Sequence, residues 1–183
     1  MIIALVIIAV LVVACIGYII STQRTLVSLD EFCSNALSQI GVQLKSRWDL
    51  IGSLVKMVEK YQKHEAGTLE NVIAMRSGGT PKTAAEINQQ ESAITKALGA
   101  INVVFERYPE LKADGVYRET MAKMEHYEEN VRHSRMVYND TVTRMNRMVR
   151  QFPSSFVASM LHFGIREYLK TDEKTEEYPE INV

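Results

Sequence analysis

The chain has 183 residues, enough for one domain of ordinary size and an anchor. Its net charge is −1, which excludes a global electrostatic attraction to nucleic acid, so we expect no nucleic-acid partner. The two cysteines, Cys15 and Cys33, lie in an apolar run and in a helical pattern, so they predict neither a disulfide nor a metal pair.

Residues 2–20 carry no charged side chain. As a helix they would be roughly 28 Å long, enough to cross the hydrocarbon core of a membrane. A cleaved signal would need a basic segment before them, and the lipobox-like run that ends at Cys15 is followed by more apolar residues. We therefore predict a retained membrane anchor over residues 1–23. Its lipid-facing side chains are Ile2, Ile3, Leu5, Val6, Ile7, Ile8, Val10, Leu11, Val12, Val13, Ile16, Ile19 and Ile20.

The basic residues near the anchor all follow it. No Lys or Arg precedes the apolar run, whereas Arg24 comes directly after it, with Lys45 and Arg47 further on. Because positive charge favours the inner side of a membrane, we predict an outer N-terminus and a cytoplasmic domain in a single-pass protein.

From Leu26 to Tyr61 apolar residues recur at three- and four-residue steps, and no proline interrupts residues 1–80. This pattern predicts one helical rod over residues 2–76. Such a rod would extend beyond shorter partner helices, leaving an apolar stripe exposed for self-association. The stripe consists of Leu26, Leu29, Cys33 and Leu37.

Two further long helices are predicted. One covers residues 82–107, with Thr80 as its N-cap and Pro81 in its first turn, and the next follows the punctuated run 108–117 and ends near Gln151. The inner face of the first is Ile87, Ile94, Leu98, Ile101 and Phe105, and that of the second is Met121, Met124, Val131, Val142, Met145 and Val149.

A short last helix is predicted after Pro153 over residues 155–169, capped by Ser154 or Ser155. The spacing of Phe156, Met160 and Phe163 indicates an apolar side that docks on the bundle, on another copy or at the membrane interface. Residues 171–183 form an acidic tail. No alternating strand pattern competes, so the predicted fold is all-α. A transmembrane helix is continuous with a long antiparallel, coiled-coil-like bundle over residues 24–170.

The run from Lys45 to Asp49 places three charged residues around the single tryptophan, Trp48, a grouping also found in active sites. On a helix, however, Arg47 faces neither Trp48 nor Asp49, because positions one and two apart point in different directions. We therefore interpret these residues as solvated charges beside one packed aromatic side chain.

The sequence predicts no catalytic, metal or cofactor site. His126 and His133 share a helix face with Glu129, but no Glu-x-x-His partner motif faces them, and "SGGTPK" lacks the ending of a phosphate loop. The better candidate is a basic face for acidic lipid heads or an acidic tail. It consists of Arg132, Arg135, Arg144, Arg147 and Arg150.

Four motifs occur in an order typical of one family: "NALSQIGVQLKSRWDLIGSLV", "ERYPELKAD", "RMVYNDTVTRMN" and "RQFPSSFVASMLHF". In them the chain resembles the LemA family over nearly its whole length. It departs from the family pattern at Leu37, Gly41 and residues 52–53, where tryptophan, aspartate and Pro-Asn are usual. The resemblance implies one transmembrane helix followed by an antiparallel bundle, and no established enzymatic activity.

Together these features predict a non-enzymatic scaffold that binds the lipid bilayer and self-associates there as a homo-oligomer. The alternative is an accessory module that recruits or regulates another membrane protein, such as a protease.

Overall fold

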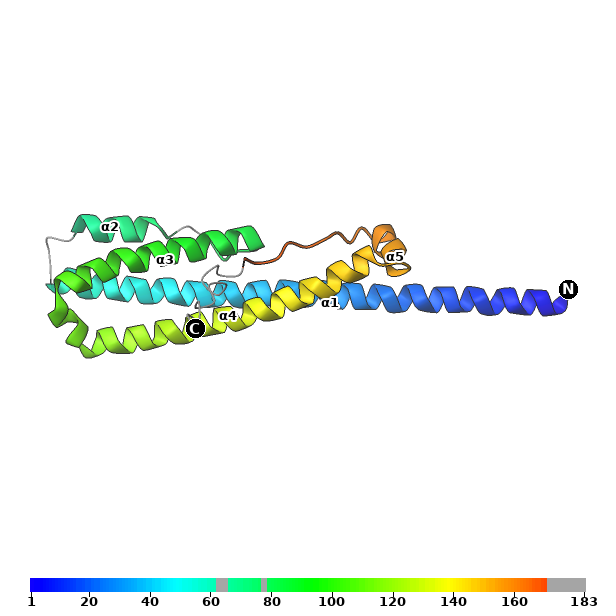
Figure 1. Cartoon of the computed structure of the whole chain (residues 1–183), viewed down its shortest axis with the longest axis horizontal. Coiled ribbons are helices and arrows are strands. Elements are labelled where there is room, and N and C mark those ends of the chain that lie inside the picture. The colour runs from blue at the N-terminus through cyan, green and yellow to red at the C-terminus, as the bar shows by residue number, and fades with distance from the viewer. Residues whose placement is uncertain (62–65, 77–78, 171–183) are drawn as a thin grey trace, which may run out of the picture.

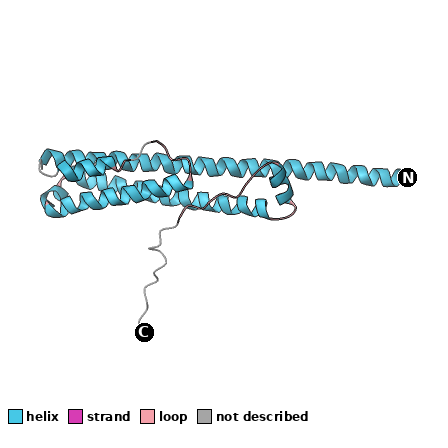
Figure 2. Cartoon of the chain, turned by 90° about the horizontal axis from the view of Figure 1, so that it is seen from above, coloured by secondary structure: helices cyan, strands magenta, loops and turns pink. Residues whose placement is uncertain are grey.

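Every regular element of the described chain is a helix. The computed structural model describes residues 1–61, 66–76 and 79–170, and within these ranges there is no β-strand. In chain order the helices are α1 (Ile2–Tyr61), α2 (Ala66–Ala74), α3 (Ala84–Arg107), the 3-10 helix η2 (Pro109–Ala113), α4 (Gly115–Arg150) and α5 (Ser154–Met160). Each α-helix from α1 to α4 runs antiparallel to the one before it, and α5 lies at the end nearest the N-terminus (Figures 1 and 2). The predicted all-α architecture is confirmed.

α1 is a single helix of 60 residues, about 90 Å long. Its first part projects beyond the other helices (Figure 1), and Thr22, 5% exposed, is its first buried residue. The predicted continuity across residues 21–28 is confirmed, but the predicted rod to residue 76 is wrong, because α1 ends at Tyr61. α2 instead turns back beside α3 and buries Val72 completely, which a straight rod would have carried past the end of the bundle.

α3 begins at Ala84 because Thr83 caps it. The Thr83 hydroxyl accepts from the Glu86 backbone amide, and the Glu86 carboxylate accepts from the Thr83 amide, which completes a capping box. The predicted cap at Thr80 is therefore wrong by one turn. The pattern T-x-x-E at residues 83–86 was the signal for the correct position.

The core lies between α1, α3 and α4, and the predicted inner faces are confirmed in it. Ile87, Ile94, Ile101 and Phe105 of α3 are each at most 1% exposed, and Leu98 packs against them at the edge. From α4, the side chains of Met124, Val131, Val142 and Met145 are buried in the same cluster, with Met121 and Val149 at its border.

α5 is shorter than predicted, and Ser154 does not cap it. The Ser154 hydroxyl donates to the Met148 and Gln151 carbonyls, and the helix ends where His162 takes a positive φ of 61°. The amides of His162 and Phe163 then donate to the Ser159 and Ala158 carbonyls, the bonds of a Schellman ending. A histidine at this position gave no sequence signal for the end, because glycine is usual there.

After α5 the chain returns along the bundle as an extended segment, residues 163–170, which we call the strap (Figure 1). Two asparagines of α4 hold its backbone. Asn146 Nδ2 donates to the Arg166 carbonyl and Asn146 Oδ1 accepts from the Arg166 amide, both at 2.9 Å. Asn139 pairs in the same way with the carbonyl and amide of Leu169, at 3.1 and 2.9 Å. Some of the strap's backbone amides and carbonyls therefore have hydrogen-bond partners although the strap is not part of a β-sheet.

Candidate functional site

Two hollows lie around Trp48, between α1, α2 and the start of α3. One hollow of about 230 Å³ is lined by Gly41, Lys45, Trp48, Arg76, Gly79, Thr80 and Gln90. A second, of about 400 Å³, continues along α1 and α2 and is lined by Trp48, Asp49, Ile51, Gly52, Ser53, Val55, Lys56, Glu59, Val72, Ile73 and Arg76. Trp48 and Arg76 border both, so the two hollows are neighbouring parts of one groove, here called the Trp48 groove.

The floor of the Trp48 groove is apolar, with one unused donor. Trp48 is only 4% exposed, yet its indole Nε1 has no hydrogen-bond partner among the described residues. A buried donor of this kind normally finds an acceptor, and this one lies beneath the groove with less than 1 Å² of exposed surface. Ile51 and Val55 supply buried apolar surface beside it.

The rim of the Trp48 groove is charged. The Arg76 guanidinium lies 2.9 Å from the Asp49 carboxylate, with both side chains about half exposed. Lys45, Lys56 and Glu59 are also exposed along the same edge of α1. An apolar floor with a mixed charged rim is suited to a peptide segment, and it brings no nucleophile together with a base.

The sequence analysis was wrong about the exposure of one side chain in this region. Lys45 and Asp49 are exposed as expected, and Trp48 is packed as expected. Arg47, however, is 6% exposed rather than solvated, because it points into the bundle and pairs with Glu128 of α4 at 3.5 Å.

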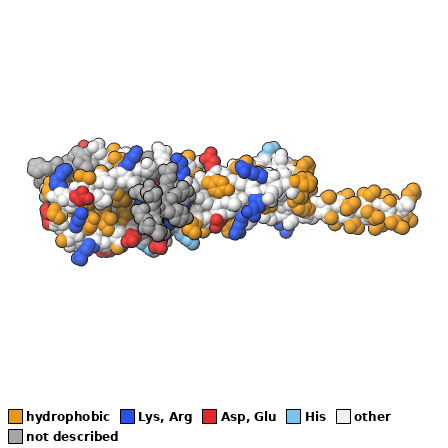
Figure 3. Space-filling view, in the orientation of Figure 1, with side chains coloured by type: hydrophobic (Ala, Val, Ile, Leu, Met, Phe, Trp, Pro, Cys, Tyr) orange, Lys and Arg blue, Asp and Glu red, His pale blue; other side chains and the backbone are white. Residues whose placement is uncertain are grey.

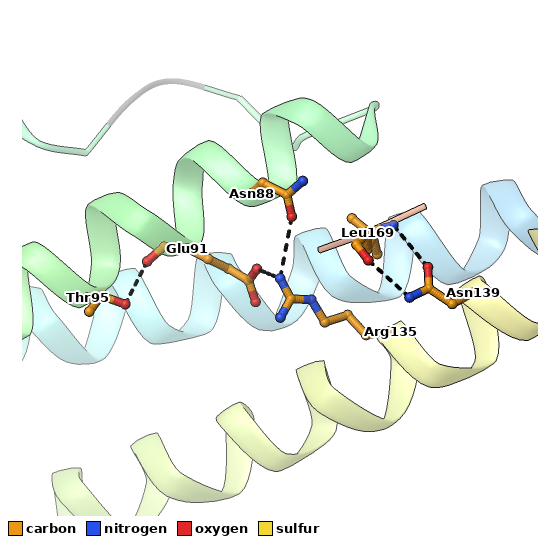
Figure 4. A network of polar contacts seen from close by, with 6 residues as sticks. All are labelled: Asn88, Glu91, Thr95, Arg135, Asn139 and Leu169. Atoms are coloured by element: carbon orange, nitrogen blue, oxygen red, sulfur yellow. Dashed lines mark hydrogen bonds and ion pairs between the residues drawn. The ribbon is translucent and has the colours of Figure 1, made fainter. Parts of the chain in front are cut away.

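The predicted basic face is not continuous, because one of its members, Arg135, forms an ion pair inside the bundle. Arg135 turns inward between α3 and α4, where it forms an ion pair with Glu91 and donates to Asn88 at 3.5 Å (Figure 4). Together with the Arg47–Glu128 pair it borders a small hollow of about 80 Å³. These pairs fix the register of three helices, because breaking one would leave a buried charge.

The other arginines of the predicted basic face are on the surface. Arg132 is exposed and lies 3.9 Å from Glu128. Arg144, Arg147 and Arg150 are exposed over the last two turns of α4, next to α5. The face is therefore two separate regions rather than one stripe.

The predicted self-association stripe is buried within its own chain, which corrects that prediction. Leu26 and Cys33 are 0% exposed, Leu37 is 5% exposed, and Leu29 packs at the edge of the core. α4 ends at Arg150, close to its predicted end, and packs along α1 beside this stripe, while α5 and the strap also contact α1. The Arg166 guanidinium of the strap also donates to Asp30 on α1, at 2.5 and 3.1 Å.

The predicted anchor residues behave differently from the stripe. All residues from Ile2 to Ile20 are exposed except Ile19, which is half-buried, and the large apolar side chains among the exposed ones are more than 40% exposed. The described residues contain one helix long and apolar enough to cross a membrane, and this run is its apolar part.

No group of three or more His, Cys, Asp or Glu side chains in the described ranges could hold a metal ion. His126 and His133 are both exposed, and His126 Nε2 lies 3.2 Å from Asn130. His64 lies outside the described residues.

Sequence reasoning missed the role of Asn139 and Asn146, which hold the strap. Asn139 and Asn146 lie seven residues apart, hence on one face of α4, and this spacing was the only available signal for the strap.

The apolar side chains Phe152, Phe156 and Met160 of the α5 region point outward, at 87%, 68% and 48% exposure. The inward side of α5 is instead Val157 and Ala158, so Phe156 and Met160 do not dock on their own bundle. Their docking on another copy or at the membrane interface stays a prediction. The helix does pack on the bundle, and Phe163 lies partly buried against the core.

Comparison with known proteins agrees with the motifs noted in the sequence. Magnetosome protein MamQ 1 and Magnetosome protein MamQ 2 of Paramagnetospirillum magneticum are each 24% identical to this chain over 195 residues. The alignment covers 91% of this chain and 72% of each relative. The LemA family pattern matches residues 36–183, which include the part of α1 from residue 36 onward, the helices α2 to α5 and the strap. The chain belongs to the LemA family.

Proposed function

We propose that this protein is a membrane-anchored interaction module, without catalysis of its own, that presents the Trp48 groove to a segment of another membrane protein. The observation that carries the proposal is the unbroken α1. The same helix supplies the exposed apolar run to Ile20 and the floor of the groove at Trp48.

A continuous helix makes the position of the groove definite. Trp48 follows Ile20 by 28 residues, which places it about 42 Å along the helix axis from the end of the apolar run. A partner would therefore be bound at a set height above the bilayer. Arg24, which follows the anchor, supports a cytoplasmic bundle in a bacterial membrane, and the similarity to bacterial relatives fits that setting.

Site-specific photocrosslinking in native membranes tests the groove. A crosslinking residue is placed at Ile73, which lines the groove and is 54% exposed, and at Val103 of α3, which is equally exposed but lies outside it. We expect the Ile73 probe to capture a distinct membrane protein, such as a protease, that the Val103 probe does not capture. Identical products from both positions would refute the groove as the binding site.

A self-associating scaffold is the second candidate. Its predicted surface is buried, but Met136 and Val137, at 61% and 45% exposure, leave apolar surface on α4 that another copy would cover. Large homo-oligomers of the purified, solubilised chain would favour the scaffold, whereas a monomer favours the recruiting role.

A further inference from the structure

α5 presents an apolar side that its own chain does not cover. Phe152, Phe156 and Met160 follow one another at four-residue steps, so the two helical members share one face. They are 87%, 68% and 48% exposed, whereas Val157 and Ala158 on the opposite side are buried. α5 is held in this orientation by contacts with both α4 and α1, so the outward face is fixed by the packing.

This apolar side lies at the end of the bundle where α1 leaves the other helices. Figure 1 shows α5 beside α1 at that end, and Figure 3 shows hydrophobic side chains gathered around the exit of the projecting helix, with basic side chains beside them. The burial of α1 changes at the same level, because Ile20 is exposed and Thr22 is buried. If residues 2–20 cross the bilayer, the surface of the bilayer lies next to α5.

The charges around α5 are basic. Arg144, Arg147 and Arg150 are exposed on the last two turns of α4, and Arg24 is exposed on α1 just after the apolar run. Residues 150–163 contain no Asp or Glu. Phenylalanine and methionine beside arginine are typical of helices that lie at a membrane surface, where arginine reaches the phosphates of anionic lipids.

We propose that α5 makes a second contact with the membrane. Phe152, Phe156 and Met160 enter the boundary between headgroups and acyl chains, while Arg147 and Arg150 bind anionic headgroup phosphates. This inference rests on the proposed anchoring through residues 2–20. One helix alone would let the bundle tilt, whereas a second contact at its base holds the long axis away from the bilayer and the Trp48 groove at a constant height.

Depth-dependent fluorescence quenching tests this contact in the full-length chain. Trp48→Phe removes the natural tryptophan, and a single new one is placed by Phe156→Trp, by Tyr18→Trp in the anchor, or by Val116→Trp at the far end of α4. Each protein is reconstituted into phosphatidylcholine vesicles with or without phosphatidylglycerol. The vesicles contain lipid brominated near the headgroup end or near the middle of the acyl chain. Circular dichroism of each variant checks that the helices are retained.

We expect the Phe156→Trp emission to shift to the blue and to lose intensity mainly with the shallow bromines, whereas Val116→Trp is not quenched. Phosphatidylglycerol should strengthen the quenching, and the pair Arg147→Gln and Arg150→Gln should remove that increase. Arg132→Gln, on the same helix but far from α5, is the matched control and should leave the increase intact.

Several results would overturn the inference. Quenching of Tyr18→Trp without quenching of Phe156→Trp would refute the α5 contact and leave the anchor standing. Failure of both would refute the anchor, and the second contact with it. Quenching that is the same with and without phosphatidylglycerol would refute the role of the arginines. A blue shift without lipid quenching, accompanied by crosslinked dimers, would show that another copy covers α5 instead.

Discussion

Replacing Asn146 with alanine should release the strap from α4 and expose the part of α1 around Cys33. Asn146 is 5% exposed and makes two hydrogen bonds of 2.9 Å with the backbone of Arg166. Alanine removes both bonds and leaves the partly buried Arg166 amide and carbonyl without this partner. Each orphaned group costs about 1–3 kcal/mol, part of which is recovered when the strap opens to water, so we expect opening to become about 2–4 kcal/mol easier.

Cys33 reports this opening. It is fully buried, burial raises the pKa of its thiol, and the nearby Arg166 guanidinium offsets part of that effect. In a Cys15→Ala background, a maleimide reagent reaches Cys33 only when the structure over it opens. Since about 1.4 kcal/mol is a tenfold change in an equilibrium constant, Asn146→Ala should accelerate alkylation by roughly 30- to 700-fold.

The assay measures the alkylation rate of the solubilised protein by mass spectrometry at neutral pH. Asn102→Ala, an exposed asparagine of α3, is the control and should leave the rate unchanged. Far-UV circular dichroism should be unchanged in both variants, because only the strap is released. An alkylation rate in Asn146→Ala that equals the control would refute the view that the two Asn146 bonds hold the strap closed.

Three further predictions concern stability. Gly41→Ala would place a Cβ 2.7 Å from Thr80 Cγ2, and we expect a loss of about 1–3 kcal/mol in thermal denaturation, because the loop must shift. Thr83→Ala should cost about 1 kcal/mol and speed hydrogen exchange of the Glu86 amide, whereas unchanged exchange would contradict the capping box. Burial raises the pKa of the Cys33 thiol, so the unfolded chain ionises first as the pH rises. The free energy of unfolding should therefore fall above about pH 8.5, and Cys33→Ala should flatten that fall.

The long helices could be predicted because their cause is local. Apolar residues at three- and four-residue steps make a buried face wherever a helix forms, so Ile87 to Phe105 identified the core side of α3 without any knowledge of its neighbours. The continuity of α1 through residues 21–28 follows from the same pattern and from the absence of proline.

The predictions that were wrong concern features that depend on contacts between distant segments. Arg47 looks like a surface charge until α4 brings Glu128 to it, 81 residues later in the chain. The seven residues of α5 make only two turns, and either side was apolar enough to face inward. Their orientation was decided by how the small Ala158 and Val157 fit against α1 and α4, which no spacing rule gives.

The strap explains both why the apolar stripe on α1 is buried and why the apolar side of α5 faces outward. Asn146 holds Arg166, and Arg166 reaches across to Asp30 on α1, so the segment after α5 is attached to both long helices. This attachment covers the apolar stripe that would otherwise favour association between copies. It also prevents α5 from rolling inward to bury Phe156, because the chain leaving α5 is fixed only a few residues later. The apolar surface at the base of the bundle is thereby moved from the side of α1, where another protein would meet it, to the outward side of α5, where the bilayer would.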